Sequence, residues 1–249
     1  MQSPSLPCPE GALRVKPGLN SLKNALAEAE EKCITEIFLE NGVHTIEEYG
    51  VNDGYDILER NYVNINLSIS IIGECREHCI VIGGLRMTGK KKDDVNVSNL
   101  TLRDSKGNGV WGDCGASIHL DNVSVENSGD IGVAVYRERG SATLYTLRNS
   151  MKNCNVSHSK RSGVCSNSLI ISGNATTIQH NGNYGLESRD GADGCIHLVA
   201  PLNIATICKN NGRGQYGGKG TLESVDKKGK VLQVIHKFED QSWEWYNTH

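Results

Sequence analysis

The segment GLESRDGADG, residues 185–194, gathers ionisable side chains of both signs: Glu187, Arg189, Asp190 and Asp193. Carboxylates can exchange protons with a substrate or hold a hard cation such as calcium, and a guanidinium can bind an anionic group. A polar surface loop has the same composition. The segment therefore predicts either a catalytic or cation-binding site or a solvated loop.

An eleven-residue pattern that recurs five times predicts how these side chains are positioned. Its third residue is aliphatic, its sixth is Ser or Asn and its tenth is Gly, and successive copies begin 23, 31, 22 and 29 residues apart. This spacing is typical of one coil of a β-solenoid, whose short strands stack about 4.8 Å apart. The copies are LTLRDSKGNGV from Leu100, VSVENSGDIGV from Val123, CNVSHSKRSGV from Cys154, TTIQHNGNYGL from Thr176 and ATICKNNGRGQ from Ala205.

Stacking of these coils predicts three columns of side chains. The third position forms an aliphatic core column: Leu102, Val125, Val156, Ile178 and Ile207. The sixth position forms a hydrogen-bonded polar ladder: Ser105, Ser128, Ser159, Asn181 and Asn210. The glycine at the tenth position serves a bend with positive φ or a close approach of two backbones.

The two ends of the chain depart from the repeat. Apolar residues at 22, 25, 26 and 29 predict an amphipathic helix over residues 20–32, begun by Asn20 or Ser21, that covers the first coil. VDKKGKVLQVIHKF, residues 225–238, predicts a hairpin, and QSWEWY follows it. We expect an extension over 1–18, the coils over 19–220, and a hairpin and tail over 221–249 that covers the last coil or contacts a partner.

The order of the predicted helix, ITEIFLENGVHTI, ISIIGECREHCIVIGG and the VSVENSGDIGV coils resembles the right-handed parallel β-helix superfamily over roughly residues 19–220. The superfamily includes pectate lyases, polygalacturonases, alginate epimerases and the carbohydrate-binding and sugar-hydrolase (CASH) repeat domains, and similar repeats occur in uncharacterised proteins of protists and large DNA viruses. The resemblance implies an all-β fold, a single-stranded right-handed parallel β-helix (pectin-lyase-like solenoid) with an N-terminal α-helical cap. It also implies that an exposed strand face binds sugar.

The resemblance implies a calcium-assisted lyase as one activity, with Arg189 as base and carboxylates on the metal. Candidate catalytic residues are then Glu187, Arg189, Asp190 and Asp113. The Asn-Thr-Asp, Gly-His-Gly, Arg-Ile-Lys and Asp-Pro-His-Glu signals of the related enzymes are missing from the chain. Asp113 and Glu187 fall three coils apart, about 14 Å, whereas a glycosidase needs two carboxyl groups about 5–9.5 Å apart.

Function is therefore predicted to be non-catalytic binding of a glycan or a protein along the strand face. A polysaccharide lyase or hydrolase acting on acidic sugars, and a structural or viral assembly module, are the alternatives. No cofactor is expected, apart from calcium if the chain is a lyase, and no metal ligands are predicted. Cys75-Arg-Glu-His-Cys79 has no second ligand cluster, and the odd count of nine cysteines favours free thiols over a disulfide framework.

Candidate binding residues follow from strand alternation after each tenth-position glycine. Alternation sends Trp111, Ala134, Cys165 and Glu187 outward, and then Asp113, Tyr136, Asn167 and Arg189. Trp111 beside Tyr136 could stack on a sugar or simply cover apolar surface. Arg137 and Arg139 could bind an acidic sugar carboxylate, or they could form a self-compensating loop with Glu138.

His158 and His180 share the fifth position of adjacent copies, beside Asp104, Asn127 and Lys209, so their rings should stack about 5 Å apart. The pair could relay protons or bind a metal, or it could be a pair of solvent-wetted turn residues.

Charge and hydropathy exclude two classes of partner. The net charge is −3, with 26 basic and 29 acidic residues, so the basic stripe that nucleic acid requires is not expected. No signal peptide and no membrane-spanning stretch are found. A cytoplasmic or virion-associated protein is expected, whose partner is a polysaccharide or a protein surface, with oligomers possible through the coil ends or the tail.

Overall fold

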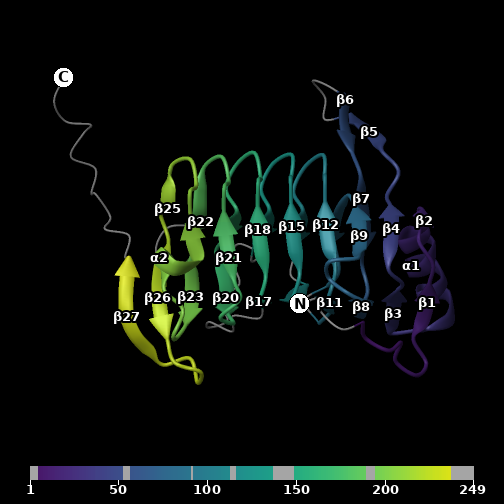
Figure 1. Ribbon diagram of the computed structural model, residues 1–249, viewed down its shortest axis with the longest axis horizontal. Coiled ribbons are helices and arrows are strands. Elements are labelled where there is room, and N and C mark those ends of the chain that lie inside the picture. Colours follow the sequence, from purple (N-terminus) through teal and green to yellow (C-terminus); the bar gives the residue numbers. More distant parts are fainter. Residues whose placement is uncertain are drawn as a thin grey trace.

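The computed structural model describes residues 5–52, 57–90, 92–112, 116–136, 149–188 and 194–236, and most of their strands belong to three stacked sheets (Figure 1). Sheet 1 has the order β1 (Leu13–Val15), β3 (Glu36–Leu39), β8 (Ile69–Gly73), β11 (Asp94–Ser98), β14 (Ser117–Asp121), β17 (Ser150–Lys152), β20 (Ser168–Ser172), β23 (Cys195–Val199), β26 (Thr221–Val225) and β27 (Val231–His236). Sheet 2 has the order β2 (Gly18–Leu19), β4 (Gly42–Thr45), β9 (Cys79–Ile82), β12 (Thr101–Arg103), β15 (Ser124–Glu126), β18 (Asn155–Ser157), β21 (Thr177–Gln179) and β24 (Cys208–Lys209). Sheet 3 runs from β7 (Tyr62–Ile65) through β10 (Gly84–Met87), β13 (Val110–Gly112), β16 (Val133–Val135), β19 (Val164–Ser166) and β22 (Tyr184–Ser188) to β25 (Gly214–Gly218).

The chain visits these sheets in rotation from β8 to β26, and we call one passage through the three sheets a coil. Strands of successive coils pair in parallel, as the eleven-residue pattern predicts. Two antiparallel pairs, β26 with β27 and β5 (Tyr49–Asn52) with β6 (Ile57–Arg60), are found in the described ranges. The chain is thus an all-β protein of long, mainly parallel sheets.

The predicted core column is present, with one correction. Leu102, Val125, Val156 and Ile178 are paired in register, and all four are fully buried. The next member is Cys208 and not Ile207, because the short helix α2 (Ile204–Ile207) precedes the strand and moves it one residue along the chain. Strands of the first coils extend the column through Val81 to His44.

The same one-residue shift changes the neighbours of the histidine pair. A run of positive φ values marks the fifth position of the copies: Asp104 (56°), Asn127 (54°), His158 (59°), His180 (57°) and, in place of the expected Lys209, Asn210 (52°). Short polar side chains tolerate this left-handed backbone better than branched ones do, which explains the residue types of the turn.

The tenth-position glycines of the first copies are required by close packing. A Cβ on Gly132 would lie 2.4 Å from Cγ1 of Val156 and 2.6 Å from the carbonyl oxygen of Gly163. Gly109 and Gly163 meet the next coil in the same way, at 2.3 Å and 2.5 Å. Of the two expected reasons for these glycines, the close approach is therefore the one that the structure supports.

Helix α1 (Ser21–Lys32) lies at the N-terminal end of the stack and packs against β1, β3, β4 and β7 (Figure 1). It buries the four predicted apolar residues: Leu22, Ala25, Leu26 and Ala29. Asn20 precedes the helix in a left-handed conformation without a side-chain cap, and the Ser21 hydroxyl donates to the carbonyl of Gly18. The described residues contain no helix with the length and apolar character needed to cross a bilayer.

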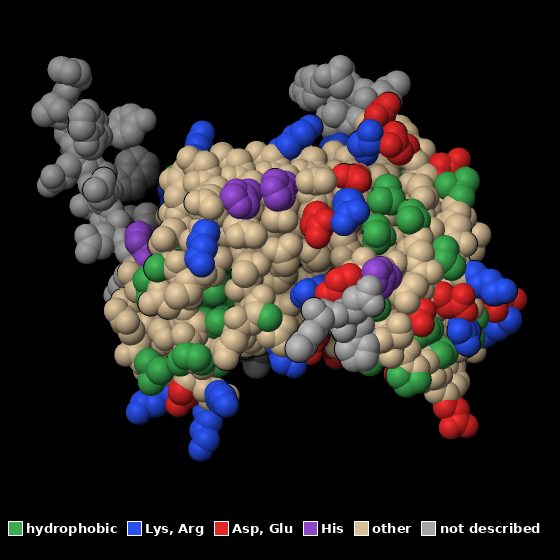
Figure 2. All heavy atoms as spheres, in the orientation of Figure 1, with side chains coloured by type: hydrophobic (Ala, Val, Ile, Leu, Met, Phe, Trp, Pro, Cys, Tyr) green, Lys and Arg blue, Asp and Glu red, His purple; other side chains and the backbone are tan. Residues whose placement is uncertain are grey.

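At the other end, β26 and β27 form the predicted hairpin, and the Asp226 carboxylate accepts from the backbone N–H groups of Lys228 and Lys230 in its turn. β27 is the last strand of sheet 1 in the described part of the chain, and its Val231, Leu232 and Val234 are exposed. Apolar side chains are visible at this end of the molecule in Figure 2. QSWEWY lies outside the described residues.

Candidate functional sites

The outer face of sheet 3 holds the first group of candidate side chains. Strand register sets Arg86, Trp111 and Ala134 side by side on β10, β13 and β16. The guanidinium carbon of Arg86 lies 4.3 Å from the Trp111 ring centroid, within cation–π range. The Tyr62 ring is tilted 59° to the same indole, with centroids 6.3 Å apart. Trp111 is half-buried in this cluster of two aromatic rings and a cation.

The outer face of β16 and β19, in the middle of sheet 3, is less exposed than strand alternation predicts. Ala134 and Cys165, predicted to be exposed, are fully buried. With Ile131 they form an outer apolar cluster, separate from the main core, on which Trp111 and Tyr136 pack. Trp111 and Tyr136 therefore cover apolar surface, and the strand face open to a ligand is shorter than alternation alone predicts.

Glu187 lies half-buried on β22, where its carboxylate accepts a hydrogen bond of 2.6 Å from the Ser162 hydroxyl. Its register neighbours are Cys165 on β19 and Gly217 on β25, so neither position supplies a second carboxyl group. Asp113, Arg189 and Asp190 lie outside the described residues, as do Arg137 and Arg139. The lyase constellation and the arginine clamp therefore stay predictions.

His158 and His180 stack as predicted, with ring centroids 5.4 Å apart and an interplanar angle of 13°. Both are exposed, and two histidine side chains lie side by side on the face shown in Figure 2. In the described ranges, no carboxylate or thiol completes a three-ligand group around them. This geometry matches two turn residues in solvent.

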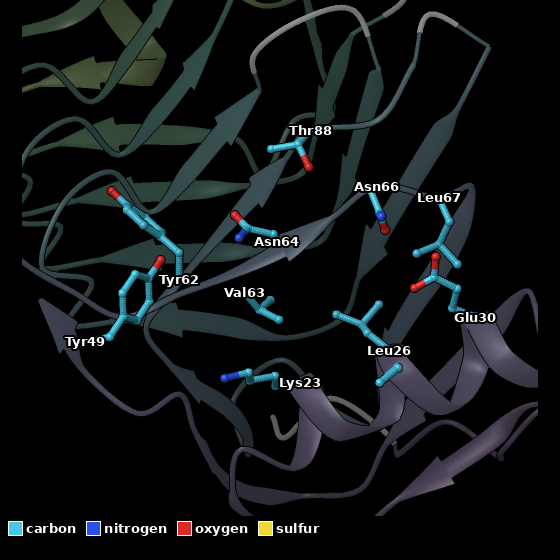
Figure 3. A pocket seen from close by; sticks show the side chains of 11 residues that line it. Lys23, Leu26, Glu30, Tyr49, Tyr62, Val63, Asn64, Asn66, Leu67 and Thr88 are labelled. Carbon is cyan, nitrogen blue, oxygen red and sulfur yellow. The ribbon is translucent and has the colours of Figure 1, made fainter. Parts of the chain in front are cut away.

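A pocket of about 470 Å³ opens between α1, the start of β5, and β7. Figure 3 shows Tyr49 and Tyr62 on one side of it, the amide of Asn64 on β7 and the amide of Asn66 just after that strand. Lys23, Leu26, Ala27 and Glu30 line it from α1, and Val63, Leu67 and Thr88 complete the wall.

Tyr62 joins this pocket to the Trp111 cluster. Burial raises the pKa of Tyr62, so its phenol stays protonated at neutral pH, and its oxygen accepts from the backbone N–H of Asn108. Sequence reasoning missed the pocket, because its residues come from segments that the repeat pattern does not include. The alternation of Asn64 and Asn66 in YVNINL is the signal that could have indicated it.

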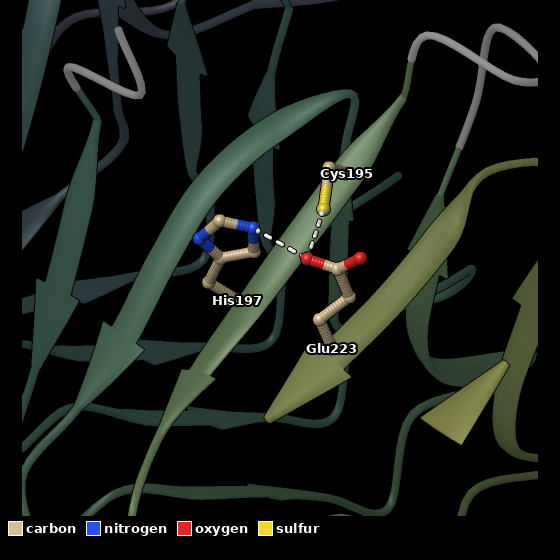
Figure 4. A group of neighbouring side chains, drawn as sticks. All are labelled: Cys195, His197 and Glu223. Atoms are coloured by element: carbon tan, nitrogen blue, oxygen red, sulfur yellow. Dashed lines mark hydrogen bonds and ion pairs between the residues drawn. The ribbon is translucent and has the colours of Figure 1, made fainter. Parts of the chain in front are cut away.

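A second cluster lies on the outer face of sheet 1 (Figure 4). Cys195 and His197 point outward from β23 and alternate with the buried Ile196 and Leu198, and Glu223 is the register partner of His197 on β26. Nε2 of His197 lies 3.0 Å from Oε2 of Glu223, and Sγ of Cys195 lies 3.8 Å from the same oxygen.

Burial, and then the neighbouring Glu223 carboxylate, raise the pKa of Cys195 to about 12, so the group is a thiol at neutral pH. Sequence reasoning missed this cluster as well. Cys-Ile-His on a strand is a usable signal, since alternation puts both ligand types on one face, but Glu223 is recognisable only once the coil length is known.

Cys75 and Cys79, the cysteine pair considered as metal ligands in the sequence, differ from Cys195 in their neighbours. Cys75 and Cys79 are both buried, and burial raises the pKa of Cys79 to about 12. The Cys75 thiol donates to the Glu77 carboxylate at 3.1 Å, and neither cysteine belongs to a three-ligand group in the part of the chain that the structure describes.

Comparison with known proteins returned no matching family model, no matching curated protein and no matching solved structure.

Proposed function

We propose that the chain is a right-handed parallel β-helix of the pectate-lyase-like superfamily, capped by α1, that binds a glycan on the outer face of sheet 3. Rotation of the chain through three parallel sheets supports the fold part of the proposal. The position of α1, which buries its apolar side against the first strands, supports the capping role.

One observation carries the binding proposal: the pocket beside β7 and the Tyr62–Arg86–Trp111 cluster form a continuous series on one face. Sugar rings offer C–H faces that pack on aromatic rings, and hydroxyl edges that need donors and acceptors. Tyr49, which is 40% exposed, supplies a ring for a sugar at the pocket, the buried Tyr62 forms part of its wall, and Asn64 and Asn66 supply amides at neighbouring outward positions.

The charges on this face favour an acidic sugar. Lys23 lines the pocket, and Arg86, on the strand next to β7, holds its guanidinium over the Trp111 indole. Glu30 is the acidic residue among the pocket residues. A uronate carboxylate would be attracted to the two cations and would lie apart from Glu30 if the sugar chain runs from the β7 end of the pocket toward Trp111.

The test is calorimetric titration of the protein with oligogalacturonate, oligo-alginate and neutral cello-oligosaccharides. We expect the acidic oligomers to bind more tightly, and Tyr49→Ala and Lys23→Ala to weaken binding about tenfold. Lys152→Ala, which removes another exposed cation, on sheet 1, is the matched control and should bind like the parent. Absence of binding by all three oligomers to the folded protein would refute the proposal.

The same oligomers test the enzyme alternative. Incubation with pectate and alginate, with and without calcium, is followed by absorbance of the unsaturated products that a lyase releases. Product that disappears in Glu187→Gln would replace the binding proposal by a lyase. The third alternative, an assembly module, stays a prediction, and the exposed apolar residues of β27 are where such contacts would form.

A further inference from the structure

We infer that Cys195, His197 and Glu223 form a binding site for one divalent transition-metal ion, zinc in the first place, on the outer face of sheet 1. The site is independent of the proposed glycan surface, which lies on sheet 3. It provides one sulfur, one nitrogen and one oxygen ligand, the three donor types that proteins use for zinc. The Cys195 thiol would release its proton to solvent as the metal–sulfur bond forms.

Distances in the cluster are close to those that a metal requires. Zinc–ligand bonds of about 2.0–2.3 Å put the ligand atoms of a tetrahedral site roughly 3.3–3.6 Å apart. The observed separations are 3.0 Å for His197 to Glu223 and 3.8 Å for Cys195 to Glu223, and all three ligand atoms lie within 4.8 Å of one another. The two Glu223 separations differ from the tetrahedral values by a few tenths of an ångström, so small side-chain movements would bring these atoms to the spacing that a zinc ion requires.

The strands hold the ligands in place before any ion arrives. β23 pairs with β20 on one side and with β26 on the other, so both ligand strands are fixed by parallel neighbours. His197 and Glu223 keep 19% of their side-chain surface exposed, which leaves a path for an ion from solvent. Sites built on such rigid elements lose little conformational freedom on binding.

The donor set also selects the kind of ion. Calcium and magnesium prefer carboxylate, carbonyl and water oxygens, whereas thiolate and imidazole favour zinc, cobalt and copper. With three protein ligands, a tetrahedral ion keeps a fourth position for water or an external ligand, as zinc does in its catalytic sites.

His119 provides a comparison within the same sheet. It points outward from β14, its Nδ1 lies 2.9 Å from the Ser150 hydroxyl, and its Nε2 lies 3.9 Å from the Asp94 carboxylate. This is a histidine with an acidic neighbour and no thiol, and it does not form a three-ligand group among the described residues. Cys195 is what distinguishes the His197 cluster from such an ordinary polar contact.

The experiment uses the full chain without a polyhistidine tag, freed of metal by a chelator. Zinc affinity is measured by competition with a chromophoric chelator, and cobalt binding is followed through its thiolate charge-transfer and ligand-field absorption. We expect one zinc per chain, a rise in melting temperature with zinc, and a cobalt spectrum with a thiolate band.

Variants separate this site from the other thiols of the chain. Cys195→Ser should remove the thiolate band, and His197→Gln and Glu223→Gln should each weaken zinc binding about tenfold or more. His119→Gln and Cys33→Ser are the matched controls and should bind like the parent. Circular dichroism verifies that each variant is folded. If Glu223→Gln is not folded, the conservative variant Glu223→Asp takes its place, since it changes the position of the carboxylate ligand and keeps its charge.

Two results would overturn the inference. One is the absence of stoichiometric zinc or cobalt binding by the folded parent. The other is binding that persists unchanged in the Cys195→Ser/His197→Gln double variant, which would assign the metal to different residues.

Discussion

The middle coils and the two ends of the stack use the same strands for different purposes. From β12 to β21 the column of Leu102, Val125, Val156 and Ile178 is aliphatic and fully buried. The same column ends in His44 at the N-terminal side and in Cys208 at the C-terminal side. The pocket beside α1 and the Cys195 cluster also lie toward these ends, and Figure 2 shows apolar side chains gathered there. The contrast indicates that repeated positions maintain the stack, and that the pocket and the Cys195 cluster, for which we propose binding, are built from residues outside the repeated positions.

The largest expected effect comes from the middle column. Leu102→Ala should lower the free energy of unfolding by about 2–5 kcal/mol, because it leaves a cavity between Val81 and Val125 that close-packed strands cannot fill. Leu232→Ala on the exposed end strand β27 is the matched control and should change it by less than about 0.5 kcal/mol. Chemical denaturation measures both. Equal effects would remove the distinction between middle and end.

Glycines give the next contrast. Gly132→Ala should cost about 1–3 kcal/mol, because the new methyl group meets the Gly163 carbonyl of the adjacent coil, and Gly132→Asn should cost more. Gly229 in the end hairpin has φ of +82° and open space around it, so Gly229→Asn should be nearly neutral, since Asn tolerates a left-handed backbone. Thermal unfolding of these three variants separates the effect of limited space from that of backbone conformation. A Gly132→Asn variant as stable as the parent would contradict the packing explanation.

The same contrast explains which structural features the sequence predicts correctly. Val125 and Gly132 were predictable, because a repeated position has the same neighbours in every coil and its residue type is constrained each time. Ile207 was wrong by one residue, because α2 inserts a helical turn that has no counterpart in the other coils. Burial of Ala134 and Cys165 was missed, because alternation gives the direction of a side chain and not what packs on it.

The binding clusters were hidden for a related reason. His197 and Glu223 are neighbours through register, although many residues separate them in sequence, and the pocket combines α1 with β7. A single sequence gives no distances across coils of unequal length. Stacking of His158 on His180 was foreseeable, since those coils carry the same number of residues between strand and turn.

Buried His44 makes the N-terminal end sensitive to pH. Burial is the main cause that lowers the pKa of His44 below its ordinary value of 6.5; one ring nitrogen, Nε2, lies 2.9 Å from the Glu40 carbonyl and the other, Nδ1, lies 2.8 Å from the Ser21 hydroxyl. The unfolded chain then binds the proton more readily than the folded chain does. Stability is therefore complete above pH 6.5 and falls as the pH is lowered below it, by at most about 1.4 kcal/mol per pH unit for one proton.

Denaturant titrations between neutral pH and pH 5 measure this slope. A His44→Gln variant should lose part of the pH dependence of stability. The control variant His119→Gln, which replaces a histidine on the outer face of sheet 1, should keep it. If the slope is unchanged in His44→Gln, the pH dependence of stability arises from other residues.

The smallest expected effect concerns the histidine pair of the middle coils. His158 and His180 occupy a left-handed turn position that other coils fill with Asn127 and Asn210, so His158→Asn and His180→Asn should alter stability by less than about 0.5 kcal/mol. His158→Val should cost about 1–2 kcal/mol, because a branched side chain opposes the left-handed backbone. The glycan and zinc titrations should be unaffected by either Asn variant. Loss of binding in them would show that a regular turn of the middle coils also carries chemistry, and the contrast with the two ends would no longer hold.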